Sequence, residues 1–446
     1  MTERVLVYGV AVAGLATVRA LLRRNIDCIA VDDSVDEAKR RAVTELGVEL
    51  IERPSDAVLT GLVVESSMVA PAPGISESHP VVDIARRADR RLVTELDLAY
   101  EWESARPGGP RPVVAVTGTD GKTSTTLLTA SMLEAGGRAT VACGNTDVPM
   151  VEALDLDVDC FVVEATSFRL AFCDSFRAEA SAWLNLAEDH LDWHQSMKSY
   201  ENAKARLWSN VRENDAAIGW IDDPIVMRHL ARARCRRVTF GVGAADYRIV
   251  DDTLVGPEGE IAPVDGLSRS LPHDLTNALC ASALVLESGL ADRRAIARAL
   301  PDFRAPSHRI EFVGEADGIR WFDDSKATTP HAVLTALRGF ESVILVAGGR
   351  NKGLDLGELA AEESRVRAVV AIGEAAPEIA RAFSGRRSVV TAGDMGEAVK
   401  AARELATDGD VVLLSPGCTS FDWYDGYARR GEDFSRRVRE LIGGRS

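Results

Sequence analysis

The stretch VVAVTGTDGKTSTT, residues 113–126, most restricts how this chain can fold. Four β-favouring residues run into the turn TGTDG (residues 117–121), and a helix-compatible segment begins at Lys122. A strand that breaks into a glycine turn directly before a helix leaves backbone N–H groups and the positive helix end facing one small volume. The stretch therefore predicts a phosphate-binding loop within an α/β sheet.

Each part of this loop has an expected partner on a triphosphate. The turn would cradle the phosphates, Lys122 would reach the β and γ phosphates, and the Thr123 hydroxyl would bind Mg²⁺. The general phosphate-loop pattern has a glycine where this chain has Val116, so the loop is a shortened variant. A plain glycine turn beside a solvated lysine is the other interpretation. It is less favoured because strand, turn, GKT and helix follow one another in order.

Length and charge limit the classes of function. A chain of 446 residues is too long for one ordinary core, so two or three domains are expected. The net charge of −16 argues against nucleic acid or a membrane surface as the main partner, because both attract clustered Lys and Arg. Anionic ligands in local basic pockets stay possible. Seven cysteines without a C-x-x-C pair indicate a reducing cytoplasm, and we expect neither a signal peptide nor a membrane span.

The N-terminal segment has the layout of a dinucleotide site. A predicted strand enters GVAVAG (residues 9–14), a helix follows, and a second strand ends at Asp32 and Asp33, the first of them 18 residues after the last glycine. Ala11 replaces the glycine that would let the backbone approach a pyrophosphate, which disfavours a tight NAD site and a dehydrogenase. A looser diphosphate site and simple helix packing both remain open.

The composition of the linkers and the alternation of predicted strands and helices divide the chain into three domains. Residues 105–112, ARPGGPRP, read as a linker, and a second boundary is expected near Arg304. The predicted domains are residues 1–106, 107–303 and 304–446. Strands and helices alternate in all three, so we expect an α/β protein with a Rossmann-like N-terminal domain, a central phosphate-loop ATPase-like domain with a mainly parallel sheet, and a Rossmann-like C-terminal domain.

Acidic residues follow two predicted strands of the central domain. Glu164 ends the strand CFVVE and is a candidate Mg²⁺ ligand, in the role of a Walker B acid. A further strand delivers Glu188, Asp189, His190 and Asp192 to the same end of the sheet, where α/β sheets place their chemistry. The alternative is that these acids cap helices or face water.

Two further residues each allow a simple interpretation. His190 and His194 have the spacing of a zinc pair, but a third strong ligand at suitable spacing is absent from the sequence. Lys204 lies in a predicted helix, where a lysine is by default solvated.

Nine sequence blocks together indicate a family. TGTDGKT, GNTDVP, VVEATSF, LNLAEDHLDWH, a helical AKAR lysine, PHDLTNAL, APSHRIE, FDDSKAT and LLSPGCTSFD occur in an order that resembles the Mur ligases of peptidoglycan synthesis. Within that family the chain is most similar to the branch that adds glutamate to UDP-N-acetylmuramoyl-L-alanine. APGI near the start and SPGCTSFDWYDGYARRG near the end favour this branch over other Mur ligases and over folylpolyglutamate synthases, which share only the central blocks.

The resemblance implies roles for individual residues. The ATP-binding set spans the central and third domains: Gly118, Thr119, Asp120, Gly121, Lys122, Thr123, Ser124, Asn277, Arg309 and Asp324. The UDP-sugar set is Gly9, Val12, Ala13, Gly14, Asp32, Asp33, Pro73, Gly74, Asn145, Ser167 and His190. The glutamate set is Lys326, Thr328, Lys352, Ser420 and Tyr427. Two Mg²⁺ ions would be held by Thr123, Glu164, His190 and Lys204, the last as a CO₂-derived carbamate. The catalytic set is Lys122, Glu164, His190, Lys204 and Lys326.

The same resemblance implies a reaction. ATP would phosphorylate the alanine carboxylate, and the amine of glutamate, D-glutamate in the main branch, would displace phosphate from the acyl phosphate. We expect a monomeric cytoplasmic enzyme with UDP-N-acetylmuramoyl-L-alanine and glutamate as substrates, and no nucleic-acid or membrane partner. An L-glutamate-adding variant and a non-catalytic nucleotide-binding regulator are the alternatives; a regulator would not need His190 and Lys204 for a second metal ion.

Some positions depart from the family pattern. Ala11 and Ala13 stand where Gly and Thr are usual, Asp274 replaces an Asn, and Arg169 replaces a commoner Gln. The loop between His190 and the lysine helix is one residue short. These departures affect the expected sugar site more than the phosphate loop.

Overall fold

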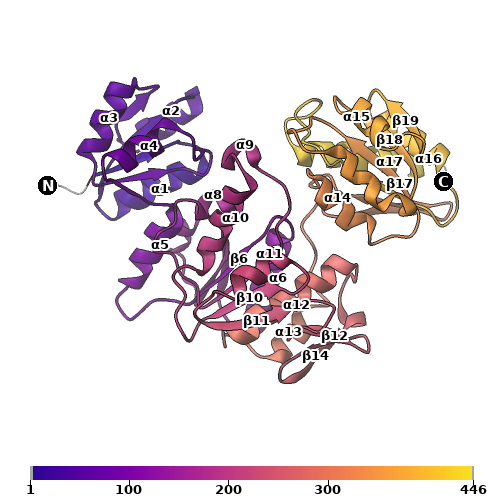
Figure 1. Cartoon of the computed structure of the whole chain (residues 1–446), viewed down its shortest axis with the longest axis horizontal. Helices are drawn as coiled ribbons and strands as arrows, with labels where there is room; N and C mark the ends of the chain where they lie inside the picture. Colours follow the sequence, from indigo (N-terminus) through magenta and orange to yellow (C-terminus); the bar gives the residue numbers. More distant parts are fainter. Residues whose placement is uncertain (1–3, 444–446) are drawn as a thin grey trace. The chain divides into compact units, whose positions relative to one another are not determined.

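The computed structural model describes residues 4–443, which fold into two compact units (Figure 1). The first unit comprises the chain up to Leu186 together with residues 190–268 and 276–303. The second comprises residues 187–189, residues 269–275 and the chain from Arg304 onward. Strands and helices alternate over most of both units, which confirms the expected α/β class with several mainly parallel sheets.

The first sheet is wholly parallel, with strand order β3-β2-β1-β4-β5. Its strands read as nearly continuous apolar runs because helices cover both faces of a parallel sheet. The elements are β1 Arg4–Tyr8, α1 Val12–Arg23, β2 Asp27–Asp32, α2 Glu37–Glu45, β3 Leu50–Glu52, α3 Asp56–Glu65, β4 Met68–Pro71, α4 Pro80–Arg87, β5 Arg91–Leu92 and α5 Glu95–Ser104.

The second sheet has six parallel strands in the order β11-β10-β9-β6-β8-β7, and β6 lies inside it. The phosphate loop therefore leaves the carboxyl end of an interior strand, where α/β sheets place their ligands. The strands are β6 Val113–Thr117, β7 Thr140–Gly144, β8 Cys160–Glu164, β9 Ala180–Trp183, β10 Ala216–Trp220 and β11 Arg236–Phe240. The helices are α6 Lys122–Ala135, α7 Met150–Ala153, α8 Ser167–Leu170, α9 Leu191–His194, α10 Met197–Ala205, η1 Arg206–Trp208, α11 Pro224–Leu230, α12 Pro272–Glu287 and α13 Arg293–Ala299.

A small antiparallel sheet completes the first unit. It contains β12 Arg248–Val250, β13 Thr253–Gly256 and β14 Gly259–Pro263, followed by the short helix η2 Val264–Gly266. Gly256 pairs with Gly259, so β13 and β14 form a hairpin.

The second unit contains one sheet with strand order β15-β16-β20-β17-β18-β19, in which β15 alone is antiparallel to its neighbour. Its strands are β15 Glu311–Ala316, β16 Ile319–Asp323, β17 Val343–Gly348, β18 Val366–Ile372, β19 Ser388–Ala392 and β20 Val411–Leu414. Its helices are α14 Pro330–Leu337, η3 Leu356–Arg365, α15 Ala376–Ala382, α16 Met395–Leu405 and α17 Tyr427–Gly443. Among residues 4–443, none of the helices has the length and apolar character needed to cross a bilayer.

Candidate active site

The phosphate loop joins β6 to α6 through a conformation that requires glycine. Gly121 has φ +83°, and a Cβ there would lie 2.8 Å from Oδ1 of Asn277. Asn185 supports the loop from below: its Oδ1 accepts hydrogen bonds from the backbone N–H groups of Thr119 and Asp120, both at 2.9 Å. Asn185 was not among the residues predicted from the sequence. Its signal was its place two residues after the end of β9, beside the loop.

Two lysines converge on one carbonyl oxygen of this loop. Lys122 Nζ donates to the carbonyl oxygens of Gly118 and Thr119, at 2.8 and 2.6 Å. Lys204 Nζ, from α10, donates to the same Gly118 oxygen at 2.6 Å. The Lys204 residue is only 1% exposed, so the default expectation of a solvated lysine is wrong. Its ammonium also lies 4.4 Å from the ring centroid of Tyr200.

Glu164 presents one unpaired oxygen next to this region. The residue is 2% exposed, and its Oε1 accepts a hydrogen bond from Asn145 Nδ2 at 3.0 Å. Its Oε2 is buried and has no hydrogen-bond partner within residues 4–443. A buried carboxylate oxygen without a partner costs free energy unless a cation or donor binds it. This oxygen therefore fits a metal ligand, as the sequence predicts.

His190 and His194 occupy different surroundings. His190 has φ +56° and packs against the rings of Phe168 and Tyr200, with centroids 4.6 and 6.1 Å away. His194 is fully buried, stacks on Phe168 and lies 3.5 Å from a carboxylate oxygen of Glu77. Both ring nitrogens of His194 are buried without a hydrogen-bond partner within residues 4–443.

The glycine turn of the N-terminal segment is tightly closed. A Cβ on Gly14 would lie 1.8 Å from the carbonyl oxygen of Gly9, so this position accepts only glycine. Asp32 accepts hydrogen bonds from the N–H groups of Val10 and Ser34, at 2.8 and 2.7 Å, which brace the turn. Burial raises the pKa of Asp32, but these bonds and one from a lysine outweigh it, so the pKa lies below the usual range.

Asp33 and Pro73, two further residues expected to contact the sugar, lie near the turn. Asp33 accepts hydrogen bonds from Tyr8 Oη and from His79, each at 2.8 Å. A small cavity beside the turn is lined by residues from both predicted domains of the first unit: Ala13, Gly14, Thr17, Ala70, Pro71, Ala72, Pro73, Thr94, Glu95, Phe168 and Arg169. Phe168 and Arg169 line this cavity from the predicted central domain. Their neighbour Ser167 begins α8, and the Val12 side chain is exposed.

The second unit holds the residues expected from its sequence blocks. Asp324 is buried, and burial raises the pKa of this carboxyl to about 7, although the Ser415 hydroxyl donates to it at 2.7 Å. Lys326 Nζ lies 5.2 Å from the ring centroid of Tyr427. Lys352 Nζ lies 2.9 Å from Asp189, in the segment 187–189 that belongs to this unit.

Two residues that sequence reasoning missed organise these loops. Arg430, buried on α17, donates to Oγ and O of Ser325 and to the carbonyl oxygen of Cys418. Burial lowers the pKa of Arg430 to about 10. His308 Nδ1 lies 2.6 Å from Asp323 Oδ2, and this pair holds the start of the unit against the end of β16. The signal for His308 was its place in the block APSHRIE.

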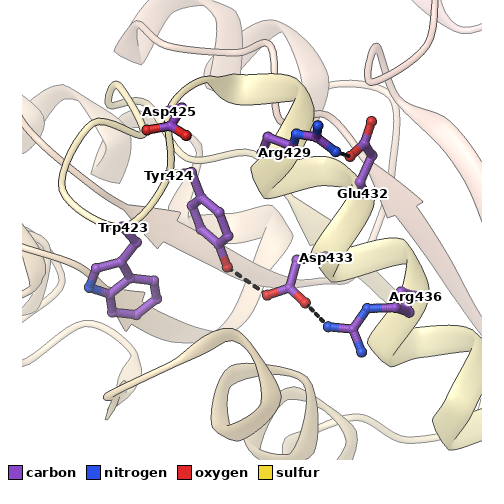
Figure 2. A pocket seen from close by; sticks show the side chains of 7 residues that line it. All are labelled: Trp423, Tyr424, Asp425, Arg429, Glu432, Asp433 and Arg436. Carbon is purple, nitrogen blue, oxygen red and sulfur yellow. Dashed lines mark hydrogen bonds and ion pairs between the residues drawn. The ribbon is translucent and has the colours of Figure 1, made fainter.

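A larger hollow on the second unit lies apart from these residues. It has a volume of about 480 Å³ and is lined by Trp423, Tyr424, Asp425, Arg429, Glu432, Asp433 and Arg436. Figure 2 shows that Tyr424 donates to Asp433 at 2.8 Å and that Arg436 pairs with the same carboxylate. Its charges are largely paired with one another, and the predicted substrate residues do not line it.

Comparisons with known proteins agree with the sequence blocks. Residues 116–285 match the Mur ligase middle domain, and residues 308–418 match the Mur ligase glutamate ligase domain. A UDP-N-acetylmuramoylalanine--D-glutamate ligase of Frankia casuarinae is 39% identical over 98% of this chain and 94% of its own. The protein of that name from Rubrobacter xylanophilus is 38% identical over 99% of both chains.

Solved structures show the same fold at low identity. A MurF ligase from Thermotoga maritima, solved in complex with ADP, superposes with a TM-score of 0.60 at 16% identity, over 100% of this chain and 99% of its own. A pseudomurein peptide ligase type C from Methanothermus fervidus gives 0.61 at 16% identity, over 100% of both chains. With full-length relatives above 30% identity and matches to two of the family's domains, this chain belongs to the Mur ligase family.

Proposed function

We propose that this chain is an ATP-dependent ligase that joins the amine of D-glutamate to the alanine carboxylate of UDP-N-acetylmuramoyl-L-alanine. Its relatives over the full length carry the name of this reaction. The observation that carries the proposal is the convergence of Lys122 and Lys204 on the carbonyl oxygen of Gly118. The loop N–H groups, the N-terminus of α6 and Lys122 make a place for the γ-phosphate of ATP, and Lys204 reaches the same loop from α10, where we assign it to the second Mg²⁺.

The chain's main work is to bring two anions together. An oxygen of the alanine carboxylate attacks the γ-phosphorus, the bond from that phosphorus to the bridging oxygen breaks, and ADP leaves. The amine nitrogen of glutamate then attacks the acyl carbon, a tetrahedral intermediate collapses, and phosphate departs while the nitrogen loses a proton. Lys122 is assigned to the charge that develops on the transferred phosphoryl group. The reaction needs no side-chain nucleophile.

Mg²⁺ is assigned to Thr123, Glu164, His190 and a carbamoylated Lys204. Bound Mg²⁺ supplies positive charge that offsets the repulsion between carboxylate and triphosphate. The unpaired, buried Oε2 of Glu164 supports this assignment.

The repulsion between Lys122 and Lys204 supports the carbamate on Lys204. The ammonium nitrogens of Lys122 and Lys204 lie 2.8 and 2.6 Å from the Gly118 oxygen, so they are at most about 5.4 Å apart. Two like charges at about 5 Å repel by about 3 kcal/mol at an effective dielectric near 20. Attack of the neutral Lys204 nitrogen on CO₂, with loss of a proton, replaces one of these charges with a carboxylate.

Each predicted domain is assigned to one substrate. Residues 1–106 are assigned to the UDP-sugar, residues 107–303 to ATP, and residues 304–446 to glutamate. The tight turn at Gly9–Gly14 supports the first assignment. The lysine–tyrosine contact between Lys326 and Tyr427 supports the last. We propose a cytoplasmic monomer, in line with a biosynthetic role.

The test is phosphate release by the purified protein. Release is expected only when ATP, UDP-N-acetylmuramoyl-L-alanine and D-glutamate are all present. The same assay with L-glutamate separates the two enantiomer branches. ATP binding without product for any amino acid would identify a regulator and overturn the proposal.

A further inference from the structure

Four polar side chains form a continuous hydrogen-bonded path that ends at the proposed metal ligand. Arg169 Nε donates to Glu95 Oε1 at 2.8 Å, and Arg169 Nη1 donates to Asn145 Oδ1 at 2.7 Å. Asn145 Nδ2 in turn donates to Glu164 Oε1 at 3.0 Å. The path therefore runs from the first turn of α5 to the end of β8.

The charged start of this path is expensive to bury. Glu95 is 5% exposed and Arg169 is 6% exposed. Removing two ions from water costs several kcal/mol each, and their attraction often only repays that cost, so such a pair is weak evidence for stability. A buried Arg–Glu pair beside a proposed active site therefore calls for a role other than holding the fold together.

The helix α5, which carries Glu95, is held in place by contacts that do not involve Arg169. Asp97, two residues after Glu95 on α5, accepts hydrogen bonds through Oδ1 from the backbone N–H groups of Asp174, Ser175 and Phe176, at 2.8–3.1 Å. The carboxylate of Glu95 is thus presented from a helix that is already held by the loop between α8 and β9. Arg169 connects this fixed point to Asn145.

The fork of Arg169 determines which way the Asn145 amide faces. Asn145 is an exposed residue, and a side-chain amide can present either its oxygen or its nitrogen to a neighbour. A guanidinium can only donate, so it selects the oxygen and leaves Nδ2 for Glu164. With Glu164 Oε1 held in this way, Oε2 is the oxygen that stays open.

We propose that Arg169 is a positioning residue that orients the Glu164 carboxylate through Asn145 and so tunes the affinity of the divalent-cation site. This inference rests on the proposed function, because Glu164 is assigned there as a metal ligand. Residues that contact a metal ligand directly, as Asn145 does here, typically change metal affinity about 10- to 100-fold when they are altered. Arg169 acts through Asn145, so we expect an effect at the lower end of that range.

The decisive variant is Arg169→Lys. A lysine keeps the positive charge beside Glu95 but has one nitrogen in place of the fork, so it cannot hold both Glu95 and Asn145 in this geometry. The matched control is Arg177→Lys, because Arg177 also forks between two carboxylates, donating to Asp215 at 2.7 Å and to Glu179 at 2.8 Å, and neither is assigned to the metal.

The measurement is Mn²⁺ binding to the full chain in the presence of ADP. Electron paramagnetic resonance detects the free Mn²⁺, and thermal unfolding of each variant is recorded alongside. We expect about 10-fold weaker Mn²⁺ binding for Arg169→Lys and wild-type binding for Arg177→Lys. Ligase turnover of Arg169→Lys should recover as Mg²⁺ is raised, which a general loss of structure would not allow.

A second variant decides the matter if Arg169→Lys does not fold. The double substitution Glu95→Gln/Arg169→Met removes both buried charges together and avoids leaving one unpaired. It should also bind Mn²⁺ about 10-fold more weakly. If a folded Arg169 variant bound Mn²⁺ as tightly as the wild type, the positioning role of Arg169 would be overturned, and the proposed function would stand. Failure of the wild-type protein itself to bind Mn²⁺ with ADP would instead remove the proposed function.

Discussion

At the scale of single residues, burial changes what familiar side chains do. Lys204 lies on a short helix whose other lysine, Lys198, is exposed, yet Lys204 is enclosed and donates to the phosphate loop. Asn185 looks like an ordinary residue after a strand, and it fixes two backbone N–H groups of that loop. Two lysines of one helix thus differ in role because the atoms that surround them differ.

Lys204→Ala should abolish turnover, with a loss of at least about 100-fold, because second-metal binding would lose its carbamate ligand. Added short carboxylates should restore part of the activity by filling the vacated place. Lys198→Ala is the control on the same helix and should keep wild-type activity. Steady-state phosphate release measures all three. Full activity of Lys204→Ala would remove the carbamate from the account.

Asp324 predicts a pH dependence of stability. Burial raises its pKa to about 7, so the folded protein retains a proton that the unfolded chain loses near pH 4. The stabilising contribution is complete below about pH 4 and is lost as the pH rises through about 7, to a total of about 4 kcal/mol. Denaturant unfolding of wild type and Asp324→Asn between pH 5 and pH 8 should therefore show the wild type losing stability relative to the variant. A difference that stays constant with pH would contradict the raised pKa.

At the scale of elements, strands were more predictable than the surroundings of side chains. β6, β17 and β20 are apolar runs bounded by turn residues, and both their type and their place follow from that pattern. Lys204 and Arg430 lie on helices whose sequences show charged residues on several faces, so local pattern could not reveal which ones are enclosed. Burial depends on contacts between segments far apart in the chain, and family resemblance was what singled out Lys204.

Glycines in two helices should respond in opposite ways to the same substitution. A Cβ on Gly431, in α17, would lie 2.2 Å from His308 Nδ1 and 2.5 Å from Asp323 Oδ2, whereas a Cβ on Gly61, in α3, meets no atom within 4 Å. Gly61→Ala should raise stability by about 1 kcal/mol through helix propensity. Gly431→Ala should lower it by about 1–3 kcal/mol through overpacking. Scanning calorimetry measures both, and a rise for Gly431→Ala would show that the His308–Asp323 pair does not need the space.

At the scale of the whole molecule, an acidic chain handles anionic reactants by local concentration of positive charge. The net charge is −16, yet the phosphate loop brings together the ammonium of Lys122 and the N-terminus of α6. The overall charge excluded nucleic acid as an expected partner, but the phosphate loop, an interior feature of one sheet, decided the class of ligand. Sequence reasoning supplied the sheets and the loop; the path from Glu95 to Glu164 needed coordinates.

The central claim is that the alanine carboxylate is activated by phosphoryl transfer from ATP. Substrate labelled with ¹⁸O in that carboxylate should yield released phosphate that carries one ¹⁸O atom, because the attacking oxygen leaves with the phosphoryl group. Mass spectrometry of the phosphate after a single turnover with D-glutamate measures this directly. Phosphate without the label would contradict an acyl-phosphate intermediate. It would also contradict the proposal that this protein is a ligase of the Mur type.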